Sequence, residues 1–375
     1  MKIGFDAKRA FHNMRGLGNY SRDLIRILQE QQMFELVLFN PKPKVHSGVR
    51  IDGHTKVITP KSFFWKKMKS LWRMLKISRL AQTESLDLYH GLSGEIPFGI
   101  QKHTRTIVTI HDLIFVRYPQ WYSFFDRKMY FWKFRQAAQK SHHIIAISEQ
   151  TKRDIVEFLG VPSEKISVVY QGCHEAFKKK YSPEIKKHTR KKFALPERFV
   201  LYVGAIEPRK NALEIVKAIK DLDIALVLVG KKTKYYDQIE AYCRKHQMKN
   251  RVIALKNVSM EELAVIYQLS TIFCYPSIFE GFGIPIVEAL FSKVPVITSQ
   301  GSCFSEAGGE DSIYINLNNA TEEIKRAIIA ITSDDEKRLQ MIEKGFKHAQ
   351  KFTDSSVYQE LISVYNRVRT IDWDM

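Results

Sequence analysis

The sequence predicts an α/β protein made of two doubly wound domains with parallel sheets. Short apolar runs alternate with helical patterns along the whole chain, which is the rhythm of β-α-β units. The runs Thr106–Ile110 and Ile144–Ile147 are continuously apolar or β-branched, as strands covered on both faces are. A length of 375 residues, 45% of them hydrophobic, favours two domains with substantial cores.

The elements of the first half follow from these runs. Strands are predicted at Ile3–Phe5, Glu35–Phe39, Lys56–Thr59, Thr106–Ile110, His143–Ile147 and Ser167–Tyr170. Helices are predicted between them, at about residues 19–31, 65–82, 123–141 and 149–159.

The second half repeats the rhythm. Strands are predicted at Phe199–Gly204, Ile224–Gly230, Val252–Leu255, Ile272–Tyr275 and Val294–Thr298. Helices are predicted near 211–221, 233–248, 259–269 and 284–292, and the tail from about 321 is predicted to be helical.

The linker is expected within Gln171–Pro196, which is polar and contains the helix breakers Ser182-Pro183 and Leu195-Pro196. The expected domains are therefore residues 1–180 and 181–352, followed by a terminal segment, 353–375. Ligands of doubly wound sheets bind beyond the carboxyl ends of the strands, so the loops after strands are where chemistry is expected.

Composition excludes several classes of protein. No run approaches the ~20 apolar residues of a membrane-spanning helix, and the charged, strand-like start does not resemble a signal peptide. The four cysteines lack C-x-x-C spacing, which disfavours a zinc site or a disulfide framework. A reduced, cytosolic protein is expected.

Positive charge is concentrated in the first half. Residues 1–185 contain 31 Lys/Arg and 16 Asp/Glu, a net of +15, whereas residues 186–375 contain 28 and 24, a net of +4. Such asymmetry indicates a polyanionic partner, which could be nucleic acid, an anionic membrane surface or a charged substrate.

The most informative motif is the string from Glu280 to Glu288, EGFGIPIVE, which follows a predicted strand. Gly281 and Gly283 permit close approach of a ligand, and Pro285 suits the first turn of a helix whose free N–H groups can bind an anion or hydroxyl. The two carboxylates can bind sugar hydroxyls. The alternative is a glycine-rich turn with two solvated acids.

A second motif, VGAIEPRKN, places Arg209 and Lys210 at a predicted helix start, after the turn at Gly204. Two cations there oppose the helix dipole unless an anion is bound, and a diphosphate would suit both. A solvated basic turn is the alternative.

Two further features lie in the first half. The string RGLGNY, with Gly16 and Gly18, resembles part of a dinucleotide fingerprint but has Ser21 in place of the third glycine, which disfavours a nicotinamide site. His111 directly follows a buried strand, where it could orient substrate or share a proton, although a lone histidine is more often structural. No string has convincing metal-ligand spacing, so no metal is expected.

These strings together resemble a GT-B glycosyltransferase of family 4, the retaining glycosyl transferases group 1 type. RGLGNY, IHDL, VGAIEPRKN and PSIFEGFGIPIVEAL match its pattern in order, and HDLIFVRYP and ISEQTKRDI are similar to a mannosyltransferase-like branch. The resemblance covers about residues 1–350. It implies two Rossmann-like domains facing a central cleft, with the last helix, near 353–373, crossing back to the first domain.

The resemblance also implies roles. Arg209 and Lys210 would hold the donor diphosphate and stabilise the leaving charge, Glu280 would bind the transferred sugar, and Glu288 the ribose. Further donor contacts are implied at Gly204, Val258, Phe282, Gly283 and Ile284. Gly16 and Gly18 would lie near the acceptor or phosphate, and His111 would line the sugar pocket. No metal cofactor is required, and the nucleophile stays unassigned, since a same-face route is often described for the family.

Two strings depart from the family pattern. Residues 171–174 read QGCH where relatives often have NGVD, and residues 300–306 read QGSCFSE without the usual proline before the glutamate. The resemblance therefore assigns no acceptor or base contacts at these two places.

The basic first half suggests an anionic membrane partner. The segment Lys61–Leu80 has seven Lys/Arg and no Asp/Glu, and as a helix it would be amphipathic. The candidate interface residues are Trp65, Lys66, Lys69, Trp72, Arg73 and Lys76. Trp121–Lys140 is a second basic and aromatic patch. The alternative is an ordinary helix packed on its sheet.

The expected function is a retaining, nucleotide-sugar-dependent hexosyltransferase that moves mannose from GDP-mannose onto a saccharide acceptor, expected to be lipid-linked, at the inner face of the cell membrane. A UDP-sugar donor (glucose, galactose or N-acetylglucosamine) is the alternative. A non-catalytic protein that binds sugar nucleotides or nucleic acid is an alternative of another class, although no nucleic-acid-binding module is present.

Overall fold

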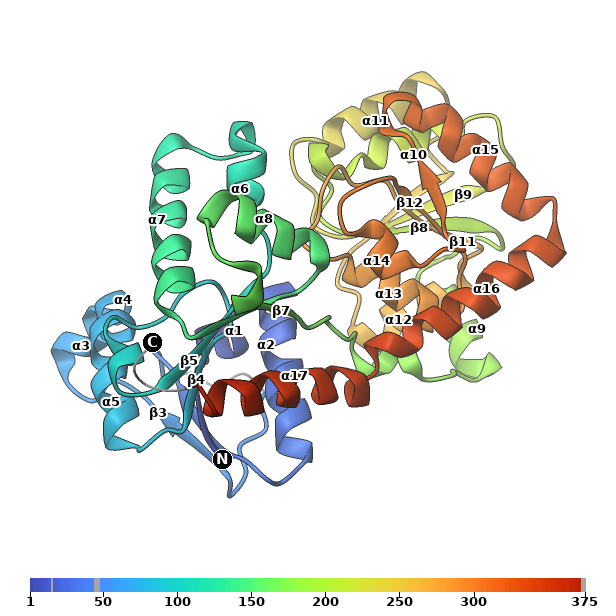
Figure 1. Ribbon diagram of the computed structural model, residues 1–375. Coiled ribbons are helices and arrows are strands. Elements are labelled where there is room, and N and C mark those ends of the chain that lie inside the picture. Colours follow the sequence, from blue (N-terminus) through green and yellow to red (C-terminus); the bar gives the residue numbers. More distant parts are fainter. Residues whose placement is uncertain (15, 44–47, 372–375) are drawn as a thin grey trace. The chain divides into compact units, whose positions relative to one another are not determined.

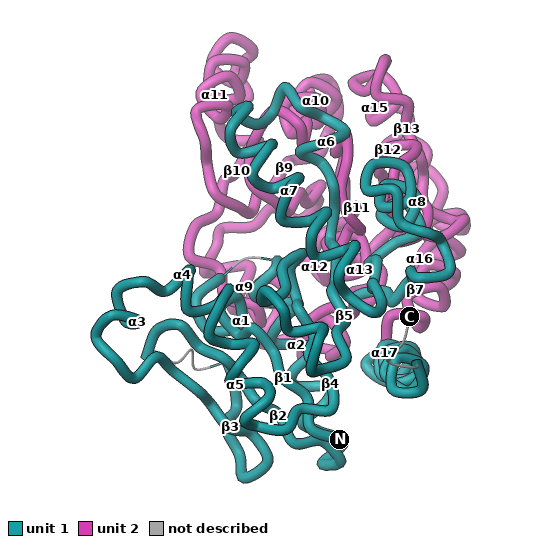
Figure 2. Tube along the Cα trace, turned by 60° about the vertical axis from the view of Figure 1, so that its left-hand side comes forward, with its two compact units in different colours: residues 1–171, 354–375 teal, residues 172–353 magenta. Residues whose placement is uncertain are grey.

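A computed structural model of the protein describes residues 1–14, 16–43 and 48–371, and it divides into two compact units (Figures 1 and 2). Unit 1 consists of Met1–Gln171 and Asp354–Met375, and unit 2 of Gly172–Thr353. The first unit thus ends earlier than the boundary expected at residue 180, and the final helix belongs to it.

The sheet of unit 1 is parallel over the described residues, in the order β3-β2-β1-β4-β5-β6-β7. Its strands are β1 (Lys2–Asp6), β2 (Glu35–Phe39), β3 (Thr55–Ile58), β4 (Leu88–Gly91), β5 (Arg105–Ile110), β6 (His143–Ala146) and β7 (Ile166–Val168). The predicted strands are present, and β4, which the sequence pattern did not indicate, is inserted beside β1.

Helices cover both faces of this sheet. They are α1 (Lys8–His12), α2 (Gly16–Glu30), α3 (Phe63–Lys67), α4 (Lys69–Leu71), the π-helical η1 (Trp72–Lys76), α5 (Ile77–Thr83), α6 (Ile114–Arg117), α7 (Phe124–Lys140), α8 (Glu149–Leu159) and α17 (Asp354–Arg369). Short 3₁₀ turns are η2 (Ile100–Lys102), η3 (Pro119–Trp121) and η4 (Ser163–Lys165).

The core of unit 1 explains why the last helix returns to the first unit. Val357, Leu361 and Val364 of α17 are buried in the same apolar cluster as strand residues such as Ile3 and Leu88. The α17 helix contacts β5 and α2, and its Tyr365 hydroxyl lies 2.8 Å from Nδ1 of the buried His90 on β4. Burial of this apolar face is the main stabilisation of the helix.

Unit 2 contains a second parallel sheet, in the order β10-β9-β8-β11-β12-β13. Its strands are β8 (Phe199–Val203), β9 (Ala225–Val229), β10 (Val252–Leu255), β11 (Ile272–Tyr275), β12 (Val296–Ser299) and β13 (Ile313–Ile315). Its helices are α9 (Pro183–Lys192), α10 (Ala212–Ala218), α11 (Tyr236–Lys245), α12 (Met260–Leu269), α13 (Ile284–Phe291), α14 (Phe304–Gly308), α15 (Ala320–Thr332) and α16 (Asp335–Ala349). The 3₁₀ turns are η5 (Glu175–Lys178), η6 (Pro208–Lys210), η7 (Leu317–Asn319) and η8 (Gln350–Phe352).

Three local expectations were wrong. The helix expected over 65–82 is broken into α3, α4, η1 and α5. The RGLGNY string, expected as a loop, forms the first turn of α2 from Gly16 onward, and Arg15 lies outside the described residues. Ser182-Pro183, taken as a helix breaker, begins α9, because the Ser182 side chain caps the helix and proline is tolerated at its first position.

Candidate active site

The centre of the candidate site in unit 2 is Glu280, in the loop after β11. Its Oε1 accepts from Nη1 of Arg209 at 3.1 Å and from Nζ of Lys210 at 2.9 Å, and both cations lie in the η6 turn that follows β8. Strands β8 and β11 are neighbours, so their carboxyl ends bring these two loops to the same edge of the sheet. The structure therefore brings the three residues predicted from two separate motifs into direct contact.

Further donors hold the same oxygen. The Tyr275 and Ser277 hydroxyls donate to Oε1 of Glu280 at 2.9 and 2.8 Å, and Lys210 donates to the Tyr275 hydroxyl at 2.6 Å. No described residue makes a hydrogen bond or ion pair with the other oxygen, Oε2. The carboxylate is thus fixed through one oxygen while the second is left for another partner.

Charge keeps this carboxylate ionised. Burial alone would raise the pKa of Glu280, but Lys210 and Arg209 outweigh that effect and hold its pKa below the ordinary value. Arg209 is shared, because its Nε also bonds Glu207 at 2.8 Å. The cluster therefore holds two fixed cations, Arg209 and Lys210, whose formal charge is matched by the two carboxylates of Glu207 and Glu280.

The loop after β12 packs against the Glu280 loop and bonds its backbone. The Ser302 hydroxyl donates to the Glu280 carbonyl at 3.1 Å, and the Cys303 thiol lies 3.2 Å from the same oxygen. The Ile278 N–H donates to the Arg209 carbonyl at 2.8 Å, which ties the two active loops together. Both Ser302 and Cys303 belong to the string that departs from the family pattern, so this support could not be read from the motif.

Glu288 lies further along, inside α13, and is 7% exposed. The buried Tyr267 hydroxyl donates to its Oε2 at 3.0 Å and fixes the side chain. Gly283 caps the helix with φ +124°, a conformation that favours glycine, and the N–H of Ile284 opens the first turn. Phe282 is buried beside this turn. The first turn of α13 therefore offers the N–H of Ile284, since Pro285 has none and those of Ile286 and Val287 bond the Gly283 carbonyl oxygen.

The ends of β8, β9 and β10 supply the remaining predicted donor residues. A Cβ on Gly230 would lie 1.8 Å from the Gly204 carbonyl oxygen. The backbone segments after β8 and β9 can therefore approach this closely only because residue 230 is glycine. Beside them is a hollow of about 520 Å³, lined at one side by Gly230 and Lys231 and at the other by Lys256 and Val258. It is large enough for a nucleobase, and Val258 lines it.

His111 lies in unit 1, immediately after β5. Its Nε2 donates to the Leu92 carbonyl at 2.9 Å, so Nδ1 is the acceptor for the Gln171 amide at 3.0 Å. Burial, with a smaller contribution from Arg9, lowers the pKa of His111 to about 4, so the ring is neutral at pH 7. Both ring nitrogens are occupied, which suits a residue that shapes a pocket better than one that shuttles protons.

The predicted phosphate loop at Gly16 and Gly18 is a helix turn, as described above. A Cβ on Gly18 would lie 1.7 Å from the Asn13 carbonyl oxygen, whereas nothing lies within 4 Å of one on Gly16. Tyr20 from the same turn packs edge-on against the His111 ring, with centroids 4.6 Å apart. The string therefore supports His111, which the motif did not indicate.

No group of three or more His, Cys, Asp or Glu side chains gathers in a metal-binding arrangement in residues 1–14, 16–43 and 48–371. Positive charge at the Glu280 cluster comes instead from Arg209 and Lys210.

Comparison with known families now decides the class of protein. Residues 184–348 match the family described as glycosyl transferases group 1, and residues 14–177 match glycosyltransferase family 4. The chain belongs to the family 4 glycosyltransferases.

Curated relatives of this glycosyltransferase include mannosyltransferases of O-antigen synthesis. The O-antigen chain mannosyltransferase B of Escherichia coli is 24% identical over 97% of this chain and 99% of its own length. The O-antigen chain mannosyltransferase RfbU of Salmonella typhimurium is 31% identical over 56% of each chain.

Solved structures share its fold. A sucrose-phosphate synthase from Thermosynechococcus elongatus superposes with a TM-score of 0.80 at 19% identity, covering 98% of this chain and 99% of the other. HepE of Anabaena, solved in complex with UDP-glucose, superposes at 0.74 and 16% identity, covering 98% and 100%. These likenesses establish the fold of the glycosyltransferase and confirm the predicted GT-B class.

The candidate membrane residues of the glycosyltransferase divide into two groups. The prediction that Trp72 lies at a membrane interface is wrong, because its side chain is 2% exposed and packs in the core against Phe39. The same prediction for Arg73 is wrong as well, since its guanidinium forms ion pairs with Asp6 and Glu95. Lys66 and Lys69 are exposed, whereas Trp65 and Lys76 are partly covered.

The apolar stripe of the same segment stays uncovered. Phe63 is 73% exposed, and Phe64, Met68, Leu71 and Leu75 are exposed as well. On α7, Phe124 and Phe125 are also exposed. Within the described part of the chain, no helix is both long and apolar enough to cross a membrane.

Proposed function

We propose that this glycosyltransferase is a retaining hexosyltransferase that transfers mannose from GDP-mannose to a saccharide acceptor carried by a lipid. The observation that carries the proposal is the Glu280 cluster, in which a carboxylate with one open oxygen lies against two fixed cations. The O-antigen mannosyltransferase relatives favour mannose as the sugar.

The cluster suggests a division of labour. Arg209 and Lys210 bind the donor diphosphate and stabilise the negative charge that grows on it as the bond to the sugar breaks. They supply this charge without a metal ion. Glu288 binds the ribose, while the hollow beside Val258 holds the base. The N–H groups at the start of α13 bind the sugar or phosphate oxygens.

Glu280 is assigned to sugar binding. Its Oε1 is bound by four donors and its pKa is held low, so the carboxylate is a weak nucleophile, and its open Oε2 can accept hydrogen bonds from sugar hydroxyls. This arrangement favours a same-face displacement, in which the leaving diphosphate assists the acceptor, over a covalent glycosyl intermediate on Glu280.

His111 is proposed to line a sugar-binding surface of unit 1. A neutral ring held by Leu92 and Gln171 keeps a fixed orientation and excludes water without adding charge. Gly16 opens α2, and a Cβ built on it meets no atom of the other described residues within 4 Å, so the acceptor or a phosphate can approach the backbone there.

A lipid-linked acceptor and a peripheral place on an anionic membrane are supported by the surface of unit 1. We define the membrane surface as two exposed patches of unit 1. One comprises Phe63, Phe64, Met68, Leu71 and Leu75 with the neighbouring Lys66, Lys67 and Lys69, and the other Phe124 and Phe125 at the start of α7. Apolar side chains next to lysines are what an anionic interface selects. Between α6 and α7 a hollow of about 190 Å³, lined by Phe115 and Phe131 with Arg127 and Lys128, could hold a short stretch of lipid chain.

A thermal-shift panel of GDP, UDP, ADP and their sugars tests the donor. A ligand that binds only the folded protein raises the melting temperature, so GDP and GDP-mannose are expected to give the largest rise. Arg209→Ala should abolish it, whereas Arg244→Ala, on the exposed end of α11, should not. A rise with UDP alone would replace GDP-mannose by a UDP-sugar, and no rise with any nucleotide would contradict the proposed function.

A further inference from the structure

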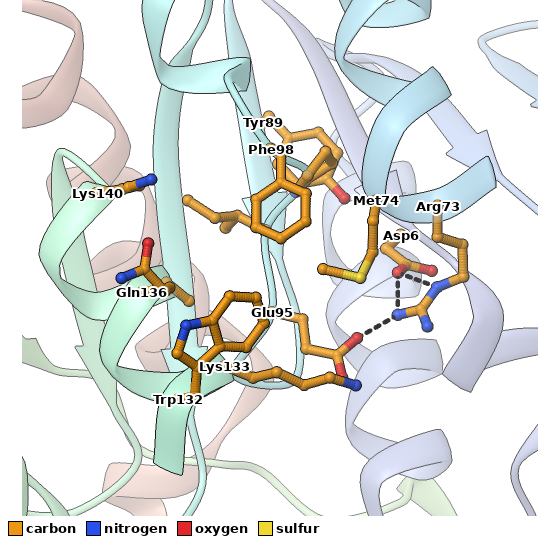
Figure 3. A pocket seen from close by; sticks show the side chains of 13 residues that line it. Asp6, Arg73, Met74, Tyr89, Glu95, Phe98, Trp132, Lys133, Gln136 and Lys140 are labelled. Carbon is orange, nitrogen blue, oxygen red and sulfur yellow. Dashed lines mark hydrogen bonds and ion pairs between the residues drawn. The ribbon is translucent and has the colours of Figure 1, made fainter. Parts of the chain in front are cut away.

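A second hollow lies at the point of unit 1 where the strand order reverses. The chain runs from β1 outward through β2 and β3, and then returns to place β4 on the other side of β1. Ligands of doubly wound sheets bind beyond the carboxyl ends of the strands at such a switch point. Asp6 ends β1, Tyr89 lies in β4, and Glu95 follows β4, and all three line the hollow (Figure 3).

One wall of the hollow is a ladder of alternating charges. Arg73 donates from Nε to Asp6 at 2.6 Å and from Nη2 to Glu95 at 2.8 Å (Figure 3), and Lys133 of α7 lies 3.3 Å from the other Glu95 oxygen. Burial would raise the pKa of Glu95, but Arg73 and Lys133 keep it low, so the ladder stays charged. Arg73 is positioned by the π-helical η1, an element frequent at functional sites.

The facing wall is apolar. Figure 3 shows Phe98, Trp132 and Met74 around the space beside the ladder. Phe98 packs edge-on against Trp132 with centroids 5.9 Å apart, and its N–H donates to the Met74 carbonyl at 2.8 Å, which ties the loop after β4 to η1. Trp132 is 49% exposed, so much of its indole is free to meet a ligand.

A buried hydroxyl, that of Tyr89, also lines the hollow and lacks a well-formed hydrogen bond. The Tyr89 side chain is fully buried, and its hydroxyl lies against the Asp6 backbone without a well-formed hydrogen bond to any described residue. Burial raises the pKa of Tyr89 well above its ordinary value, so the hydroxyl keeps its proton and can donate. The hollow has room of about 30 Å³ for water-sized groups, enough for one hydroxyl or hydroxymethyl group but not for a ring.

We propose that this hollow is a subsite for one hexose ring of the saccharide acceptor. The ring lies outside the hollow with its C–H face on the exposed indole of Trp132, a hydroxymethyl group enters the hollow toward Tyr89, and ring hydroxyls bridge Glu95 and Lys133. The subsite rests on the proposed function, because it names where the acceptor of that reaction would bind.

The chemistry of the walls selects a sugar over other occupants. A neutral polyol both donates and accepts, so it can bond the carboxylates and the cations of the ladder together. Arg73, Lys133 and Lys140 line the hollow together with Asp6 and Glu95, so an anionic headgroup would meet charges of both signs. An apolar chain would remove water from the charged pairs without replacing its hydrogen bonds. Aromatic walls with a few fixed polar groups are typical of small-molecule sites.

The loop after β4 connects this subsite to His111. The Leu92 carbonyl accepts from His111, Gly94 N–H donates to Thr109 O of β5 at 2.8 Å, and Glu95 belongs to the ladder. One short loop thus carries a contact to the predicted sugar pocket at its start and the subsite at its end. A saccharide of more than one ring could therefore be held along unit 1.

Fluorine NMR on the full chain labelled with 5-fluorotryptophan tests the subsite directly. Trp132→Phe assigns the Trp132 resonance, and methyl α-D-mannopyranoside and methyl β-D-glucopyranoside are then titrated. One of these glycosides is expected to shift the Trp132 resonance in a saturable manner while that of Trp121 stays in place. If neither glycoside moves it, or if only phosphatidylglycerol vesicles do, the proposal is overturned.

A matched pair of variants adds a second readout. Saturation transfer to the bound glycoside should fall at least tenfold in Trp132→Ala and be unchanged in Trp121→Ala, which removes an indole outside the hollow. Equal transfer in both variants would overturn the subsite. Each variant must keep the thermal shift given by the donor nucleotide, which reports correct folding. A wild-type chain that binds the glycoside but no nucleotide would contradict the proposed function and leave the subsite intact.

Discussion

Lys210 and Glu280 lie 2.9 Å apart, although they come from loops after two different strands. The pair joins the cation expected at the leaving diphosphate to the carboxylate expected at the sugar, so the two halves of the donor would be held by one rigid cluster. Because Glu280 Oε1 is bound four times, movement of either loop changes the position of both groups. Donor binding and sugar orientation should therefore be coupled.

Glu280→Gln should separate these two functions. Loss of the negative charge leaves Arg209 and Lys210 less neutralised, so GDP is expected to bind as tightly as before or more tightly. Sugar transfer should nevertheless fall by about 100-fold, because an oriented acceptor of sugar hydroxyls is lost. Isothermal calorimetry with GDP and a transfer assay with GDP-mannose measure the two effects.

Glu207→Gln is the matched control, because Glu207 also pairs with Arg209 but belongs to the turn before η6. It should retain most of the transfer activity. An equal loss in both variants would mean that Glu280 acts through the charge of Arg209 and not through the sugar.

Acid should destabilise unit 1 through histidines that are buried in their neutral form. Burial lowers the pKa of His90 to about 3, and burial together with nearby cations lowers those of His111 and His143 to about 4. In the unfolded chain each histidine takes up a proton near pH 6.5, while the folded chain does not. Stability is therefore fully present above pH 6.5 and is lost as the pH falls toward 4.

The expected slope is about 1.4 kcal/mol per pH unit for each such group. Urea unfolding monitored between pH 7.5 and 4.5 measures it. His143→Gln should reduce the slope, and His188→Gln, which changes an exposed histidine of α9, should leave it unchanged. A pH-independent free energy of unfolding over this range would contradict the assignment.

The membrane surface predicts salt-sensitive binding to vesicles. The chain should sediment with phosphatidylglycerol vesicles at low salt and be released as salt rises, because lysines near an anionic leaflet contribute about 1 kcal/mol each. Phe63→Ser with Phe64→Ser should weaken binding, while Leu339→Ser, an exposed site of unit 2, should not. Equal binding to neutral phosphatidylcholine vesicles would argue against an electrostatic surface.

Sequence patterns predicted the charged residues of the site better than the residues that hold them in place. Arg209, Lys210 and Glu280 were read from strings that follow strands, and parallel strands bring such strings to one edge. Ser302 and Cys303 support Glu280 through its backbone atoms, which no side-chain pattern records. Trp72 was misjudged because helical spacing cannot tell an exposed stripe from a core stripe when the helix is broken by a π turn.

Strand β4 is absent from the strands that the sequence predicts, and this omission affected the predicted site more than the error at Trp72. Its string Leu88–Gly91 is short and ends in histidine and glycine, so it lacks the apolar run that marked its neighbours. Without β4 the switch point of unit 1 could not be located, and the loop that holds both Leu92 and Glu95 had no expected role. The acceptor side of the molecule was therefore the part that the sequence left open.

The two glycines of the α2 turn give the last prediction. A methyl group on Gly18 would collide with the Asn13 carbonyl oxygen at 1.7 Å, a backbone atom that cannot move aside cheaply, so Gly18→Ala should destabilise the chain by about 1–3 kcal/mol. The methyl group of Gly16→Ala meets no atom of the other described residues within 4 Å and should leave the free energy of unfolding unchanged or slightly raised, since alanine favours helix. If acceptor or phosphate passes the backbone at Gly16, the same variant should raise the KM of the acceptor several-fold. Urea unfolding and transfer kinetics on the two variants separate these effects, and a Gly16→Ala enzyme with normal KM would remove Gly16 from the site.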